Sequence, residues 1–205
     1  MTAMEIWLVR HGKTRGNLER RYIGSTDQPL APEGREELSS LWKERNEEKA
    51  PQLVFTSALR RTGETASLLF PGAPQRALSG FNETNFGNFE NKTYEELCRE
   101  PAYKAWLDSG GMDAPPGGEG KEAFLERVEE AFEAALSEAF SRKLSRAVFV
   151  LHGGCIMALM ERFGPAGKGF YHWQVKNGRG FALSVDEGEW ERGRKNFTKI
   201  RSIPS

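Results

Sequence analysis

Two of the three histidines stand where an apolar run ends, and a glycine follows each of them. The run Ile6–Val9 leads to Arg10 and His11, and the run Ala147–Leu151 leads to His152. Short apolar runs that end at charge and glycine predict buried parallel strands, and ligands gather at the carboxyl ends of such strands. A guanidinium and an imidazole at that edge can bind and attack a phosphate group. The repeated pattern favours one shared site over two histidines that only orient loops.

A second guanidinium is expected near the same edge of the sheet. The run Leu53–Phe55 predicts another short buried strand, and a helix is expected to follow from about Ala58. Arg60 falls in the first turn of that helix, where backbone N–H groups also favour an anion. In the alternative interpretation, Arg60 and Arg61 are ordinary surface residues, as most Arg-Arg pairs are.

The periodicity of the apolar residues predicts the elements that position these groups. Helices are expected from Pro32, from about Ala58 to Phe70, from Lys121 to Lys143 and from Cys155 to Phe163, and a hairpin is expected from Phe181 with its turn at Asp186–Gly188. A further helix over Tyr94–Asp108 contains Pro101, which predicts two pieces or a kink. Alternating strands and helices indicate an α/β fold with three layers, in which helices flank a mainly parallel central sheet.

Length and composition restrict the class of protein. A chain of 205 residues fits one α/β domain spanning residues 1–205, with two small domains as the weaker alternative. The 29 basic and 29 acidic side chains balance, so the basic excess of a nucleic-acid binder is absent. No segment approaches the roughly 20 apolar residues of a membrane helix, and the start of the chain leaves no room for a signal peptide. Cys98 and Cys155 form no disulfide framework, which predicts a cytoplasmic protein. The oligomeric state is not indicated.

Other phosphate chemistries lack their motifs. A cysteine-based phosphatase needs an arginine six positions after its cysteine, but Glu161 follows Cys155 and Lys104 follows Cys98 at that spacing. No phosphate-binding loop of the G-x-x-x-x-G-K-[ST] type occurs, and no histidine pair has the spacing of a zinc site. We therefore expect neither a metal nor another cofactor.

The ordered set of motifs resembles the histidine phosphatase superfamily, also called phosphoglycerate-mutase-like. The matching motifs are Leu8–Gly12 with Asn17, Tyr22–Gly24, Asp27, Pro29, Leu30, Gly34, Ser57 to Ala66 with Arg60, Phe81–Glu90, Pro116–Glu119 and His152–Gly154. They cover roughly residues 5–160 in the family's order and spacing. A lone Arg-His-Gly is a common tripeptide, whereas the ordered set is specific.

The resemblance implies a role for each matching residue. His11 would be the nucleophile that takes the phosphoryl group. Arg10, Arg60 and His152 would hold the phosphate oxygens, and Asn17 would add a hydrogen bond. Phosphoryl transfer needs such fixed positive charges around the oxygens and a nucleophile in line with the leaving group.

The resemblance also implies an acid and two backbone positions. Glu83 would protonate the leaving oxygen and then accept a proton from the attacking water, with Glu90 and Glu119 as alternative acids. Gly12 and Gly153 would let the backbone approach the phosphate without a Cβ in the way.

The residues after Glu83 favour the phosphatase branch of the family. Mutases carry Arg-His-Tyr-Gly there to hold the substrate carboxylate, but this chain has the neutral Thr84 and Asn85. The chain is similar to the branch that includes α-ribazole-phosphate phosphatases of cobalamin biosynthesis. That implies a metal-independent histidine phosphatase of the acid type, acting on α-ribazole 5′-phosphate or a related small sugar phosphate. A phosphoglycerate mutase and a non-catalytic phospholigand sensor are the alternatives. Lys13 and Met157 depart from the family's pattern.

Residues 94–120 are expected to form a lid-like insertion over the site, because glycine and proline punctuate this segment between core elements. Aromatic residues near it offer two interpretations. Phe81, Phe86, Phe89 and Trp106 either flank a bulky base of the substrate or belong to the core.

Overall fold

A six-stranded sheet forms the centre of the computed structural model, which describes residues 3–43 and 51–204. The strands are β1 (Ala3–Arg10), β2 (Val54–Thr56), β3 (Gln75–Ala77), β4 (Arg146–Leu151), β5 (Gly180–Asp186) and β6 (Thr198–Ile203). Their order is β3-β2-β4-β1-β5-β6. The first four in this order are mutually parallel, and β5 and β6 run antiparallel to their neighbours. The expected mainly parallel sheet is confirmed.

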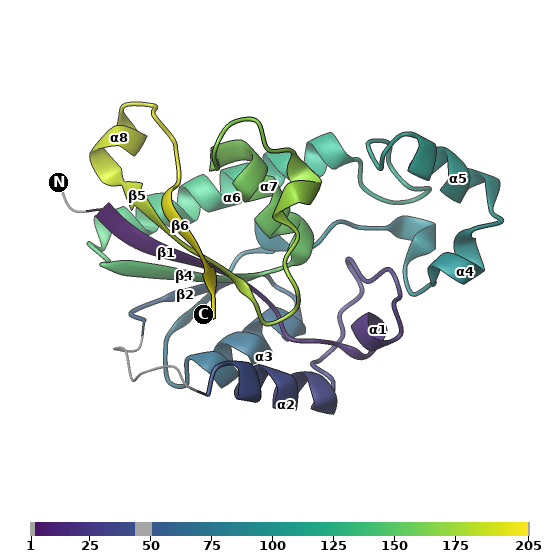
Figure 1. Cartoon of the computed structure of the whole chain (residues 1–205), viewed down its shortest axis with the longest axis horizontal. Helices are drawn as coiled ribbons and strands as arrows, with labels where there is room; N and C mark the ends of the chain where they lie inside the picture. The colour runs from purple at the N-terminus through teal and green to yellow at the C-terminus, as the bar shows by residue number, and fades with distance from the viewer. Residues whose placement is uncertain (1–2, 44–50, 205) are drawn as a thin grey trace.

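Helices cover both faces of the sheet, which completes the expected three layers (Figure 1). The helices α6 (Lys121–Ser141) and α7 (Gly153–Phe163) lie on one face, and α2 (Pro32–Leu41) and α3 (Arg60–Leu69) lie on the other. The short elements are α1 (Arg15–Leu18), α4 (Tyr94–Leu97), α5 (Pro101–Asp108), α8 (Glu187–Glu191), η1 (Ser79–Phe81), η2 (Gly87–Phe89) and η3 (Phe170–Trp173). Within the described residues, no helix is long and apolar enough to cross a membrane.

Strand β1 has a continuous apolar run because it is buried on both faces. Its side chains alternate between the two layers. Ile6 and Leu8 pack into the cluster under α6 and α7, whereas Trp7 and Val9 pack into the cluster on the opposite face. The two neighbours of β1 in the sheet, β4 and β5, both lie in the second half of the chain.

Of two local predictions from the sequence, the break at Pro101 is confirmed and the turn at Asp186–Gly188 is not. Pro101 divides the expected helix over Tyr94–Asp108, because proline lacks an N–H and starts α5 instead of continuing α4. The expected turn at Asp186–Gly188 is wrong, since the short helix α8 connects β5 to β6. The carboxylate of Asp186 accepts a hydrogen bond from the N–H of Glu189 and caps this helix.

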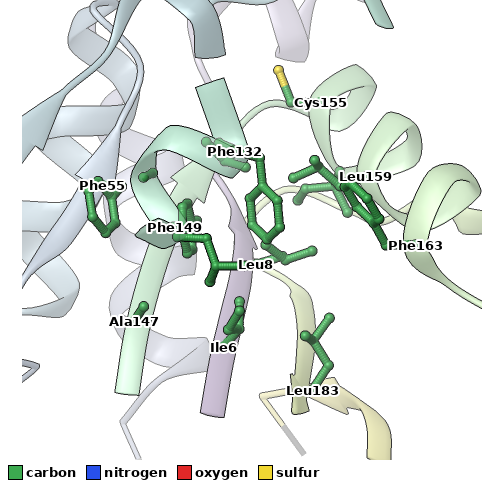
Figure 2. Packing of buried hydrophobic residues seen from close by; sticks show 14 of the residues in the cluster. Ile6, Leu8, Phe55, Phe132, Ala147, Phe149, Cys155, Leu159, Phe163 and Leu183 are labelled. Carbon is green, nitrogen blue, oxygen red and sulfur yellow. The ribbon is translucent and has the colours of Figure 1, made fainter. Parts of the chain in front are cut away.

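Phe149 on β4 lies at the centre of the larger core cluster, among the labelled side chains of Figure 2. Its ring centroid lies 4.9 Å from that of Phe55 and 5.1 Å from that of Phe132. We expect Phe149→Ala to lower the free energy of unfolding in urea by about 3–5 kcal/mol, because it removes buried area and leaves a cavity. The surface control Leu68→Ala should change it by less than about 0.5 kcal/mol. Equal effects of the two substitutions would contradict this account of the core.

Candidate active site

Parallel pairing of β1 with β4 brings the two predicted strand ends together. Arg10 pairs in register with Leu151, so the next residue of each strand, His11 and His152, enters the same space. The backbone N–H of His11 donates to the carbonyl of Leu151 (2.9 Å). The two imidazole rings lie edge to face with centroids 5.1 Å apart. The sequence-based prediction that both histidines share one place is confirmed.

His11 has a defined tautomer in this structure. Its Nδ1 lies 2.6 Å from the carbonyl oxygen of Gly12, and a carbonyl can only accept, so Nδ1 carries the proton. The neutral ring therefore has its lone pair on Nε2. Burial and the positive charges of Arg61 and Arg10 lower the pKa of His11 well below its usual 6.5, although the bond to Gly12 acts in the opposite direction. His11 is thus an uncharged imidazole with a nucleophilic Nε2 at neutral pH.

Arg10 has a buried donor that the described part of the chain leaves unused. One Nη1 hydrogen goes to the carbonyl of Val175 (2.7 Å), but Nε has no hydrogen-bond partner among the described residues. Burial lowers the pKa of Arg10, and the negative charge of Glu83 raises it. An unpaired buried donor of this kind is costly unless an acceptor binds to it. An anion beside His11 would supply that acceptor.

The second guanidinium at the site belongs to Arg61, not to the expected Arg60. The Arg60 side chain is 60% exposed and pairs with Glu64 one turn along α3. Arg61 is fully buried, and its Nε–H donates to Nδ1 of His152 (3.2 Å). Successive helical residues point about 100° apart around the axis, so neighbouring arginines face different sides. The expected position is therefore wrong by one residue.

Arg61 is held by neutral acceptors. Its Nη1 donates to the carbonyl of Thr26 (2.8 Å) and its Nη2 to the carbonyl of Gly24 (2.7 Å). Within the described residues, no carboxylate accepts a hydrogen bond from it. Burial lowers the pKa of Arg61, and the negative charge of Glu83 raises it. A buried cation without a carboxylate in contact favours the binding of an anion.

Hydrogen bonds also fix the protonation of His152. Because Nδ1 accepts from Arg61, the neutral ring carries its proton on Nε2, which donates to Oγ of Ser57 (2.8 Å). Burial, then the positive charge of Arg61, lowers the pKa of His152 well below 6.5. His152 therefore uses both ring nitrogens inside the protein. In this structure it supports the Arg61 guanidinium and contacts the His11 ring.

Glu83 lies against the N-terminus of α7. Its Oε2 accepts from the N–H of Gly154 and its Oε1 from the N–H of Thr84, both at 3.0 Å. A Cβ on residue 154 would lie 2.3 Å from Oε1 of Glu83, so the carboxylate can approach only because that residue is glycine. Glu83 lines the cleft described below. Backbone donors alone hold this carboxylate among the described residues.

The two alternative acids have other partners. Glu90 accepts from the backbone N–H groups of Gly24, Ser25, Thr26 and Phe86. Burial raises the pKa of Glu90, but these bonds and the hydroxyl of Thr26 outweigh it, so the pKa is lowered. Glu90 thereby holds in place the loop whose carbonyl oxygens accept hydrogen bonds from the Arg61 guanidinium.

Glu119 forms a two-point ion pair with Arg127, with both N···O distances at 2.7 Å. Its carboxylate is therefore committed to a cation. Of the three glutamates considered from the sequence, Glu83 is the one that lines the cleft and has neither a cation nor a side-chain hydroxyl as its partner among the described residues.

The predicted backbone and amide positions contribute in different ways. The N–H of Gly12 donates to Oγ1 of Thr65 (3.0 Å), so Gly12 acts at the site through its carbonyl. Gly153 begins α7, and a Cβ there would lie 3.3 Å from the Arg10 guanidinium. Asn17 lines the cleft; its Oδ1 accepts from the N–H of Thr14 (3.1 Å), which leaves its amide N–H groups as donors.

A cleft of about 890 Å³ opens over this cluster. Its lining includes Arg10, Asn17, Glu83, Gly153 and Gly154. His11 lies behind that lining and is 4% exposed. The outer part is lined by aromatic and basic side chains from α5, α6, η3 and the loops, namely Arg21, Tyr22, Phe86, Trp106, Lys121, Phe170 and Tyr171. The two departures from the family pattern, Lys13 and Met157, also line the cleft.

Sequence reasoning missed the segment that follows η3. Asn177 donates from Nδ2 to the carbonyl of His11 (3.0 Å), and Val175 supplies the carbonyl that holds Arg10. Both residues lie in an irregular loop, where no periodicity marks them. In residues 3–43 and 51–204, no group of three or more His, Cys, Asp or Glu side chains is arranged to hold a metal ion.

Known proteins share this arrangement of elements and motifs. The model of the histidine phosphatase superfamily (branch 1) matches residues 6–198. The chain is 31% identical over 189 residues to the adenosylcobalamin/alpha-ribazole phosphatase of Escherichia coli (strain K12), a match that covers 90% of this chain and 91% of the relative. The crystal structure of the alpha-ribazole phosphatase from Shigella flexneri superposes with a TM-score of 0.81 at 30% identity, covering 98% of this chain and 96% of that one.

A second kind of relative matches less of the chain. Phosphoglycerate mutase-like protein 4 of Arabidopsis thaliana is 30% identical over 170 residues, which cover 80% of this chain and 73% of the relative. The relatives therefore include both phosphatase and mutase-like names.

The neighbouring arginines make a matched pair of variants. Arg61→Lys should weaken the binding of inorganic phosphate by about tenfold or more, because an ammonium group cannot replace the guanidinium fork. Arg60→Lys should change the dissociation constant by less than about twofold, since the exposed pair with Glu64 contributes little. Isothermal titration calorimetry measures both. Stronger weakening by the Arg60 substitution would restore the original expectation.

The buried neutral histidines make folding stability depend on pH. The pKa values of His11 and His152 lie well below 6.5 in the folded chain, so the unfolded chain binds more protons below about pH 6.5. Stability is therefore full above that pH and is lost as the pH falls. From pH 7.5 to 5.5 the two histidines should lower the free energy of unfolding by up to about 3 kcal/mol.

Urea denaturation at the two pH values tests this linkage. His152→Gln should remove about half of the difference between them. If the free energy of unfolding of His152→Gln changed between the two pH values as much as that of the wild type, His152 would not contribute to the pH dependence.

Proposed function

The chain belongs to the histidine phosphatase superfamily, and from that premise we propose that it hydrolyses phosphate monoesters through a phosphohistidine at His11. The observation that carries the proposal is a neutral imidazole with Nε2 unprotonated beside the half-buried Arg10, whose buried Nε–H has no partner among the described residues. A phosphate group between them would satisfy the donor and receive the nucleophile. Arg61 adds a second buried positive charge.

In the first step, Nε2 of His11 attacks phosphorus while the ester P–O bond breaks. Arg10 and Arg61 hold the negatively charged oxygens, and the amide of Asn17 adds a donor. Glu83, protonated at this stage, gives its proton to the leaving oxygen, because an alkoxide is a poor leaving group. The Nδ1–H bond to the Gly12 carbonyl stabilises the positive charge that develops on the ring.

In the second step, water attacks the phosphohistidine. The Glu83 carboxylate accepts a proton from the water, the water oxygen bonds to phosphorus, and the P–N bond breaks with its electron pair returning to Nε2. Inorganic phosphate leaves, and Glu83 is again protonated. Two guanidinium groups supply the positive charge for both steps, so we propose that the reaction needs no metal.

The side chains that line the outer part of the cleft favour a substrate with a large aromatic group. Phe86, Trp106, Phe170 and Tyr171 line it, and flat side chains of this kind stack on an aromatic group. Together with the names of the relatives, this favours α-ribazole 5′-phosphate or a related sugar phosphate with a bulky base. Phe81 and Phe89 do not take part, because both are fully buried in core clusters.

Residues 94–120 act as a lid in this proposal, within a single domain spanning the chain. Trp106, Leu107 and Gly111 come from this segment and line the cleft. The hydroxyl of Tyr171 donates to the carbonyl of Gly110 (3.3 Å) and connects the lid to the loop across the cleft. The cytoplasmic location stays a prediction.

A panel of phosphate esters tests the function. With chelator present, α-ribazole 5′-phosphate should give a higher kcat/KM than simple sugar phosphates and aryl phosphates, measured as phosphate release. His11→Ala should lower turnover by about a thousandfold or more and abolish labelling by a ³²P-substrate. His172→Ala, which changes an exposed histidine outside the cleft lining, should keep the label.

Three outcomes would contradict parts of the proposal. Interconversion of 2- and 3-phosphoglycerate without phosphate release would make the protein a mutase. Tight phosphate binding without turnover would make it a phospholigand sensor. Equal kcat/KM across the sugar phosphates would remove the support for a bulky base.

A further inference from the structure

Arg127, on α6, uses every N–H of its guanidinium. A guanidinium has five N–H donors in a planar fork. Nη1 donates to the carbonyls of Gly80 (2.9 Å) and Asn82 (2.7 Å), and Nη2 reaches the carbonyl of Glu83 (3.3 Å). The remaining two donors, from Nε and Nη2, go to the carboxylate of Glu119. Such complete use of an arginine fixes its orientation and that of its partners.

The carbonyls that Arg127 holds all belong to one short segment of backbone. It runs from Gly80 to Glu83 and ends at the residue proposed as the acid. The segment lies close against α6, since a Cβ on residue 80 would come within 2.6 Å of the Cβ of Ala131. At the far side of Glu83, the carboxylate is held by the N–H of Gly154. Arg127 therefore fixes the backbone and α7 fixes the carboxylate.

Glu119 fixes Arg127 in turn. Its two oxygens accept in parallel, the geometry that is strongest and most directional for a guanidinium and a carboxylate. Burial lowers the pKa of Arg127, but the hydrogen bonds that it donates to Glu119 and the negative charge of that carboxylate outweigh burial and raise the pKa. The backbone N–H of Glu119 also donates to the carbonyl of Asn85 (2.9 Å). The segment carrying Glu83 is thus bound on two sides by the same pair.

We propose that Arg127, oriented by Glu119, is a positioning residue that sets where the carboxyl group of Glu83 meets the leaving-group oxygen. The proposal rests on the role of Glu83 as the acid in the proposed function. A general acid must lie within hydrogen-bond reach of the atom it protonates, and a displacement of about 1 Å can cost a large part of the rate. Arg127 itself does not line the cleft.

The shape of the guanidinium matters here, and not only its charge. Three carbonyls and a carboxylate surround one planar group, which a lysine ammonium with three donors cannot serve at once. Arg127→Lys keeps the positive charge near Glu83 but releases part of the backbone segment. This substitution therefore separates positioning from simple electrostatics.

The test compares kcat/KM for an alkyl phosphate and an aryl phosphate in wild type, Glu83→Gln and Arg127→Lys. The ratio kcat/KM reports the step in which the leaving group departs, and an aryl oxygen needs less protonation. Glu83→Gln should lower the alkyl value by about a hundredfold and the aryl value by less than about tenfold. Arg127→Lys should show the same preference, about tenfold for alkyl and about twofold for aryl.

The controls separate a loss of positioning from a loss of fold. Arg162→Lys changes an exposed arginine on α7 that pairs with Glu129 on α6, the helix that carries Arg127, and it should leave both values unchanged. In the double variant Glu83→Gln with Arg127→Lys, the alkyl loss should match that of Glu83→Gln alone, because one function is removed twice. If thermal unfolding shows that Arg127→Lys does not fold, Glu119→Gln takes its place in the comparison. It should also lower kcat/KM more for the alkyl phosphate than for the aryl phosphate.

Two results would overturn the positioning role. One is an equal loss for both esters in Arg127→Lys or its substitute, and the other is no loss for either. If Glu83→Gln itself lowered kcat/KM equally for the two esters, Glu83 would not be the acid. No phosphate release by the wild type from either ester would overturn the proposed function and, with it, this inference.

Discussion

The buried guanidinium of Arg61 is the constraint around which the site is arranged. Removing a cation from water costs several kcal/mol unless its hydrogen bonds are replaced, and here two carbonyls and His152 replace them without a carboxylate in contact. Three of its five N–H donors are therefore used by the described residues, and no carboxylate in contact neutralises its charge. A bound phosphate group can supply the missing negative charge. Burial, and then the same positive charge, lowers the pKa of His11, so in the proposed function Arg61 both attracts the phosphate group and helps to keep the attacking imidazole neutral.

The three glutamate carboxylates around the site have different partners and therefore different roles. Glu90 binds backbone N–H groups of the loop that supplies carbonyls to Arg61, and Glu119 binds Arg127. Because these two negative charges are used to build the site, they do not compete with an anionic ligand for the buried cations. Glu83 is the one of the three that both borders the cleft and has only backbone donors as its partners among the described residues. Similar residues at similar motifs thus have different roles, which their partners decide.

The strand ends could be predicted because the apolar runs before His11 and His152 are continuous and each ends at glycine. The choice between Arg60 and Arg61 depends on the rotational phase of α3. A signal for it exists, since Glu64 follows Arg60 by four residues as in a surface ion pair. The edge strand β3 could not be predicted, because its residues are exposed and lack an apolar pattern. The loop that binds Arg10 is irregular, and only tertiary packing places it.

The position of β1 in the sheet has a consequence for the order in which the protein acquires its structure during synthesis. Both hydrogen-bonded neighbours of β1, namely β4 and β5, are made more than a hundred residues later. Contacts so distant in sequence close slowly and late. The carbonyl of Val175 and the amide of Asn177, which hold Arg10 and the His11 backbone, are translated after β4. The contacts that hold Arg10 and the His11 backbone therefore cannot form until these segments have been translated, so β1 emerges long before the proposed phosphate site can assemble.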